Sequence, residues 1–200
     1  MKSSSRLADS CLDVQVAGLR QIIHQSDRVL AILERTGALG LPHWYLGAGA
    51  VTQTVWNHLH GFDAGRGIKD YDLIYFNGDD LSAESETDVE RETTAILEGL
   101  DVNLDLTNEA RVHLWYQERF GRSIEPYESS EEAISTWPTT ASCIGIRLEG
   151  ERFKVCAPYG LRDLFDLVVR PNKVLVGREI YEAKATRWAE QWPELTIHSW

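Results

Sequence analysis

Apolar residues recur every three or four positions along the first part of the chain, which is the spacing of one face of an α-helix. Asp9 and Ser10 precede this pattern as candidate N-terminal caps, and Gly37 and Gly40 follow it just before Pro42. We therefore predict one long amphipathic helix at the start of the chain, with its buried face formed by Leu12, Val16, Leu19, Ile23, Leu30 and Leu33.

The rest of the chain alternates between strand-like and helix-like patterns. Short apolar runs between glycine, proline or polar residues predict strands at 43–46, 70–76 and 102–107, and a hairpin formed by 142–148 and 152–156. Helical spacing predicts further helices at 51–59, 82–100, 109–120 and 181–192. The expected fold is α+β, a mixed β-sheet with helices packed on one side, a long N-terminal helix and a C-terminal helix, in a single domain of residues 1–200.

Composition narrows the classes of function. The 200 residues are 43% hydrophobic and include seven Trp and seven Tyr, which is enough to bury a core. The net charge of −11 argues against broad nucleic-acid binding, because that binding depends on Lys and Arg neutralising phosphates. Binding through a local basic groove is the alternative that this charge leaves. The three cysteines lack metal-ligand spacing, and no apolar run is long enough to span a membrane. We expect a cytoplasmic protein with free thiols.

Two carboxylates one residue apart, Asp70 and Asp72, begin the predicted strand at 70–76. Residues i and i+2 of a strand point to the same face, so both side chains would enter one pocket and repel each other unless a cation is present. Mg²⁺ prefers oxygen ligands and is typically held by one or two carboxylates together with substrate phosphates. The pair therefore indicates a site for Mg²⁺ or Mn²⁺ with a nucleoside triphosphate.

A third acid, Asp105, falls on the polar face of the predicted strand at 102–107. Three carboxylates on neighbouring strands would suit two metal ions that clamp the attacking and leaving oxygens of a phosphoryl displacement. An isolated Asp-x-Asp is more often not a metal site. Its position after a glycine turn and a helix is what favours the metal.

The turn at 46–50, Leu-Gly-Ala-Gly-Ala, is expected to bind phosphate through Gly47, Gly49 and Ala50. Small side chains let phosphate oxygens approach the free N–H groups and the positive end of a following helix. The alternative is an ordinary strand-to-helix turn that needs glycine for its dihedral angles. The nearby acids favour phosphate binding.

Three polar residues complete the candidate nucleotide site. Asn108 is a candidate helix cap, and Arg111, three positions on, would lie on the same side of that helix and could offer several donors to a triphosphate. Lys69 is either a phosphate ligand or a solvated lysine. For His113 and Trp137 we favour packing or backbone hydrogen bonding, with a place at the pocket as the alternative.

The order of glycine turn, helix, Asp-x-Asp strand and a further acidic strand resembles the nucleotidyltransferase fold of DNA polymerase β, the poly(A) polymerases and the tRNA nucleotidyltransferases. A closer resemblance is to a bacterial nucleotidyltransferase-like family of unsettled function. That resemblance covers most of the chain, through the segments 49–57, 68–76, 108–116 and 157–165. It implies Asp70, Asp72 and Asp105 as metal-binding catalytic residues and Gly49 as part of the triphosphate cradle.

The chain also departs from the tRNA-type motif. There the turn reads Gly-Gly-Ala-Val-Arg-Asp, whereas residues 48–53 here read Ala-Gly-Ala-Val-Thr-Gln. Our leading hypothesis is a Mg²⁺-dependent nucleotidyltransferase that moves a nucleoside monophosphate (NMP) from a nucleoside triphosphate (NTP) to an unidentified acceptor. The alternatives are a non-catalytic nucleotide-binding or interaction protein, which the missing arginine favours, and a metal-dependent phosphate-ester hydrolase.

Overall fold

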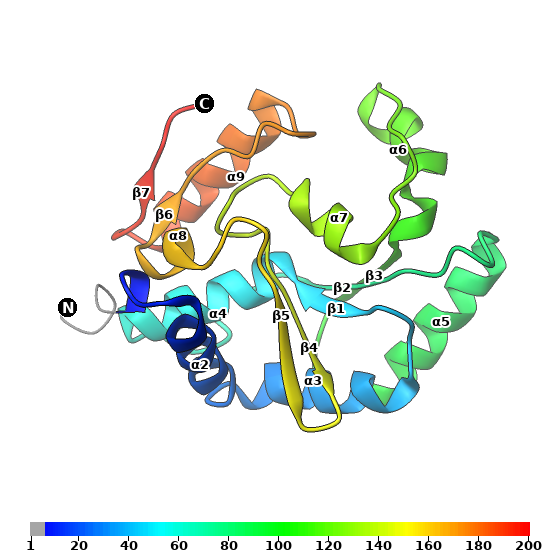
Figure 1. The fold of residues 1–200 in the computed structure, drawn as a ribbon, viewed down its shortest axis with the longest axis horizontal. Helices are drawn as coiled ribbons and strands as arrows, with labels where there is room; N and C mark the ends of the chain where they lie inside the picture. Colours follow the sequence, from blue (N-terminus) through cyan, green and yellow to red (C-terminus); the bar gives the residue numbers. More distant parts are fainter. Residues whose placement is uncertain (1–6) are drawn as a thin grey trace.

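The computed structural model describes residues 7–200 and is built around a five-stranded mixed sheet (Figure 1). The strand order is β3-β2-β1-β4-β5. β2 and β3 run parallel, and the other neighbours are antiparallel. The strands are β1 Tyr45–Gly47, β2 Tyr71–Tyr75, β3 Leu104–Asn108, β4 Gly145–Glu149 and β5 Arg152–Cys156. The predicted mixed α+β sheet is confirmed.

The N-terminal segment differs from the prediction, because it forms two helices instead of one: α2 Leu12–Ile23 and α3 Asp27–Leu39. Ser26 has an extended backbone, with φ −103° and ψ 93°, and its carbonyl accepts the Leu30 N–H at 2.9 Å to begin α3. The three- and four-residue apolar spacing continues across this break, so the pattern alone could not reveal it. Gly40, at φ 69°, ends α3 as a left-handed cap.

One face of the sheet packs against helices α3, α4 and α5, and α2 packs against α4 (Figure 1). α4 Ala48–His60 follows β1 directly and is buried over most of its length. α5 Ala83–Ile96 lies against β3. The main hydrophobic core fills this layer and includes Leu46 and Leu73 from the sheet and Val51 and Val55 from α4.

The opposite face of the sheet carries a smaller apolar cluster beneath α7 Ser130–Ser135, formed by Tyr45, Ile74, Ile134 and Cys143. The expectation that helices pack on one side therefore describes the larger layer only. The remaining helices are η1 Glu109–Arg111, α6 Val112–Phe120, α8 Arg162–Phe165 and α9 Arg178–Gln191. Within the described part of the chain, no helix is both long and apolar enough to cross a membrane.

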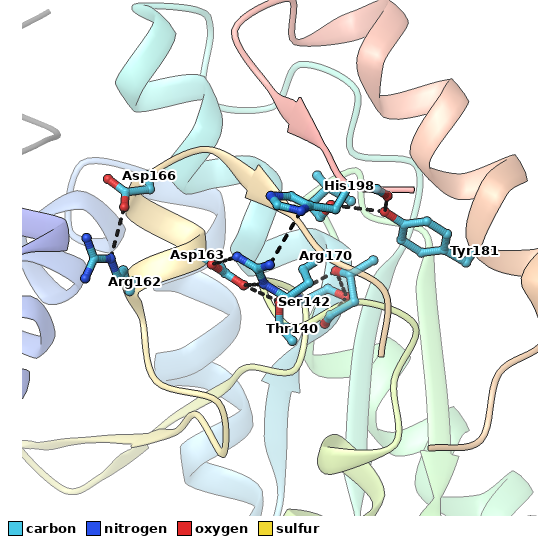
Figure 2. A network of polar contacts seen from close by, with 10 residues as sticks. Thr140, Ser142, Arg162, Asp163, Asp166, Arg170, Tyr181 and His198 are labelled. Carbon is cyan, nitrogen blue, oxygen red and sulfur yellow. Dashed lines mark hydrogen bonds and ion pairs between the residues drawn. The ribbon is translucent and has the colours of Figure 1, made fainter. Parts of the chain in front are cut away.

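A polar network joins the C-terminal segments to the loop before β4 (Figure 2). Thr140 Oγ1 donates to Asp163 Oδ2 at 2.6 Å, and Arg170 Nε donates to the same oxygen at 3.1 Å. Tyr181 Oη, on α9, donates to the Val169 carbonyl at 3.0 Å. Val169 belongs to the short β6 Val168–Val169, which pairs with β7 Thr196–Ile197. These contacts connect α9 and the segments around β6 with the loop that precedes β4.

Candidate functional site

Two acidic side chains lie next to each other on the face of the sheet that also carries α7. Asp72 of β2 and Asp105 of β3 are register partners in the parallel pair. Asp70 immediately precedes β2, two residues before Asp72, and its charge raises the pKa of Asp72. The structure therefore brings together the three acids expected from the sequence, with Asp72 and Asp105 lining one cleft.

The cleft has a volume of about 270 Å³ and lies between the sheet, α6, the loop after α7, and α9. Its floor contains Asp72 and Asp105. The rest of the lining is largely aromatic and apolar: Trp115, Tyr116, Phe120, Tyr127, Trp137 and Ile180. A cleft lined by both acids and aromatic rings suits a ligand with a charged part and a planar part.

Burial and repulsion mark Asp72 as an unusual carboxyl group. Burial raises its pKa to about 6, and the charges of Asp70 and Asp105 act in the same direction. The charge of Lys184 and a hydrogen bond from the Gly49 backbone N–H oppose this shift. Asp72 thus lies where negative charge is in excess, a condition typical of functional sites.

Glu109 is a fourth acid of the cleft that the sequence analysis did not identify. Its side chain is only 6% exposed, in η1 directly after β3. Burial, followed by the charges of Asp72 and Asp105, raises its pKa to about 8. An acid at a helix start is commonly a favourable partner of the helix dipole, so the position of Glu109 in the chain does not by itself indicate a site.

The residues of the glycine turn have different surroundings. Gly47 is covered by Trp137, because a Cβ there would lie 2.6 Å from Cη2 of the indole and 2.7 Å from the Ile144 carbonyl oxygen. Ala48 lines the cleft in a left-handed conformation, with φ 47°. The N–H of Gly49 at the start of α4 points to Asp72. Ala50 is buried in the main core.

The polar residues predicted around the acids are not among those that line the cleft. Asn108 caps η1 as expected, accepting the Ala110 N–H at 3.2 Å. Arg111 forms an ion pair with Glu86 and donates to the Leu81 carbonyl at 2.9 Å. Lys69 is exposed. The contact of Arg111 with a triphosphate stays a prediction; here α5 supplies Glu86 as its partner, which helix spacing alone does not reveal.

The two aromatic residues left open by the sequence have different positions. Trp137 lines the cleft above Gly47. Its backbone carbonyl accepts a hydrogen bond from Asn172 Nδ2 at 2.9 Å, which ties the loop to the segment after β6. His113 is not part of the cleft lining, and its buried Nδ1 has no hydrogen-bond partner among the described residues.

Lys184 is a second residue that the sequence analysis missed. It lies on α9, lines the cleft, and its charge acts on both Asp72 and Asp70. Burial lowers the pKa of Lys184, and the two aspartates oppose that shift. Because 112 positions separate Lys184 from Asp72 by their residue numbers, only the folded chain brings them together.

A divalent cation fits the donor set of this cleft. Within residues 7–200, no three His, Cys, Asp or Glu side chains converge closely enough to hold a metal ion by themselves. Mg²⁺ usually takes one or two carboxylates and completes its shell with substrate phosphates and water. Asp72, Asp105 and the nearby Asp70 supply such oxygens, and a cation would offset both the burial that chiefly raises the pKa of Asp72 and the repulsion that adds to it.

Comparisons with known proteins point in the same direction. A family model described as nucleotidyltransferase matches residues 34–197. A solved NMR structure, described as revealing a CCA-adding enzyme head domain, is similar with a TM-score of 0.74 and 26% sequence identity. The similarity covers 91% of this chain and 95% of that one. A search of curated proteins found no match.

Proposed function

This chain belongs to the nucleotidyltransferase family, and we propose that it transfers an NMP group from an NTP to the hydroxyl of an acceptor, with Mg²⁺ held by Asp70, Asp72 and Asp105. The observation that carries this proposal is the pairing of Asp72 with Asp105 across two parallel strands, with the N-terminus of α4 pointing to the same place. The two carboxylates suit a metal ion, and the N-terminus of α4 suits a phosphate group.

The residues of the chain have separate roles in this proposal. Asp70, Asp72 and Asp105 would hold the metal, and the bound ion would neutralise charge on the phosphates in the transition state. Asp105, the exposed member of the pair, also accepts the proton of the attacking hydroxyl. The N–H of Gly49, which points to Asp72 in this structure, would be a donor for a phosphate oxygen once a bound cation had neutralised that carboxylate. The aromatic side of the cleft holds the base and excludes water from it.

The direct test uses each of the four NTPs, labelled at the α-phosphate, with Mg²⁺ and hydroxyl-bearing acceptors such as a short RNA with a free 3′ end. The wild-type chain should release pyrophosphate and move the label to an acceptor. Asp72→Asn should abolish both, whereas Asp79→Asn, which removes an exposed acid beyond β2, should leave both unchanged. Label released only as NMP would indicate a hydrolase. Binding without turnover for every acceptor would favour the binding protein instead.

A further inference from the structure

The proposed function creates an electrostatic problem inside the cleft. Asp72 and Asp105 already line its floor, and an NTP brings about four more negative charges, of which one Mg²⁺ neutralises about two. A polyphosphate bound here therefore needs a cation from the protein. The question is which side chain supplies it.

The glycine turn does not supply that cation. Its following residues, Thr52 and Gln53, are buried and uncharged. Thr52 Oγ1 donates to the Ala48 carbonyl at 2.8 Å and also lies 3.2 Å from the Ala141 carbonyl. Gln53 Nε2 lies beside Gly49, 2.7 Å from where a Cβ of that residue would stand. Both side chains are thus directed into the protein, and the turn offers only backbone N–H groups.

The other candidate cations do not face the acids of the cleft: Lys69 is exposed and is not part of the cleft lining. Arg111 is paired with Glu86. Arg119 lines the cleft, but its guanidinium carbon lies over aromatic rings, 5.6 Å from the Trp115 ring centre and 5.4 Å from that of Phe120. Of the cations that line the cleft within the described residues, only Lys184 acts on the charges of Asp72 and Asp70.

The helix that carries Lys184 is held firmly against the main core. Trp188, one turn further along α9, packs edge-on against Trp56 of α4 at 5.0 Å. Trp192 Nε1 donates to Asn57 Oδ1 at 2.8 Å. Lys184 Nζ itself lies 5.1 Å from the Trp188 ring centre. Because α4 also begins at the glycine turn, these contacts fix the distance between Lys184 and the α4 N-terminus.

We propose that Lys184 is the residue that binds the polyphosphate of the NTP, together with the backbone N–H groups at the α4 N-terminus. An ammonium group donates up to three hydrogen bonds and suits phosphate oxygens as a compact charge. Without ligand, the same charge partly offsets that of Asp72. This inference rests on the proposed function and extends it, since it makes the C-terminal helix part of the substrate site.

The test compares binding of each NTP, the matching NMP and inorganic tripolyphosphate to the full chain with Mg²⁺, measured by calorimetry. Lys184→Met should weaken NTP and tripolyphosphate by roughly tenfold to a hundredfold, the value of one charge-assisted hydrogen bond, and should change NMP binding little. Lys184→Arg should keep most of the affinity. Lys173→Met, which removes an exposed lysine outside the cleft lining, is the matched control.

The outcomes separate this inference from the function on which it rests. Wild-type affinity for NTP in Lys184→Met, or an equal loss for NTP and NMP, would overturn the role of Lys184 while leaving nucleotidyl transfer in place. No binding of any NTP by the wild-type chain would overturn both. If Lys184→Met does not fold, Lys184→Gln, which keeps a polar head without the charge, decides the question by the same comparison.

Discussion

Glu109 should make the protein less stable as pH rises, and Glu109→Gln should remove this part of the pH dependence, leaving the smaller part that comes from Asp72. A carboxyl group with a raised pKa in the folded state holds its proton more tightly there than in the unfolded chain. Stability is therefore greatest below the ordinary value of 4.5, where both states are protonated, and falls until the pH passes the folded value of about 8. The buried Glu109 is thus unfavourable for stability at neutral pH.

The magnitude follows from that window. One proton difference is worth about 1.4 kcal/mol per pH unit. Between pH 4.5 and pH 7 the contribution of Glu109 to the free energy of unfolding should decrease by about 3 kcal/mol. Because Gln has nearly the same shape and does not ionise, the variant should become more stable than the wild-type protein by that amount over the same range.

The assay is urea unfolding of the wild-type protein, Glu109→Gln and Glu118→Gln at several pH values between 4.5 and 8. Glu118 is exposed on α6, so its substitution should leave the pH dependence of the wild-type protein intact. Parallel curves for the wild-type protein and Glu109→Gln would refute the reasoning, because they would mean that folding does not raise the pKa of Glu109.

Two further predictions concern packing and redox state. Gly47→Ala should destabilise the protein by roughly 1–3 kcal/mol, the usual effect of overpacking, because the new Cβ would meet the Trp137 ring and the Ile144 carbonyl; thermal unfolding would check this, and an unchanged melting temperature would contradict it. The structure has three cysteines, all of them free thiols: Cys11, Cys143 and Cys156. Dithiothreitol should therefore leave the melting temperature unchanged. A mass lower by two hydrogens before reduction would show a disulfide and contradict this prediction.

The sheet and its acids could be predicted because their signals are local. Alternation with a period of two residues identifies strands, and it also places Asp70 and Asp72 on one face. The parallel pairing that puts Asp105 beside Asp72 follows once both strands are assigned to one sheet. For the same reason Asn108 could be recognised as a cap from its position before a helix.

The rest of the site depends on contacts between distant segments. Lys184 reaches the cleft only because α9 packs on α4 through its tryptophans. Arg111 turns to Glu86, which lies on another helix, so its spacing from Asn108 was misleading. Trp137 occupies the space above Gly47. From the sequence alone, a glycine at that position is equally consistent with space for a phosphate group. Local periodicity contains no information on any of these pairings.

The central claim, that this cleft binds an NTP with Mg²⁺ through Asp72, is tested most directly by the melting temperature with each component alone and with both. A ligand at a hundred times its Kd stabilises the native state by about 2.7 kcal/mol, which for a domain of this size raises the melting temperature by roughly 5–10 °C. We predict that shift for NTP and Mg²⁺ together, a much smaller one for either alone, and none for Asp72→Asn. No shift of the wild-type protein with any of the four NTPs would contradict nucleotide binding at this site.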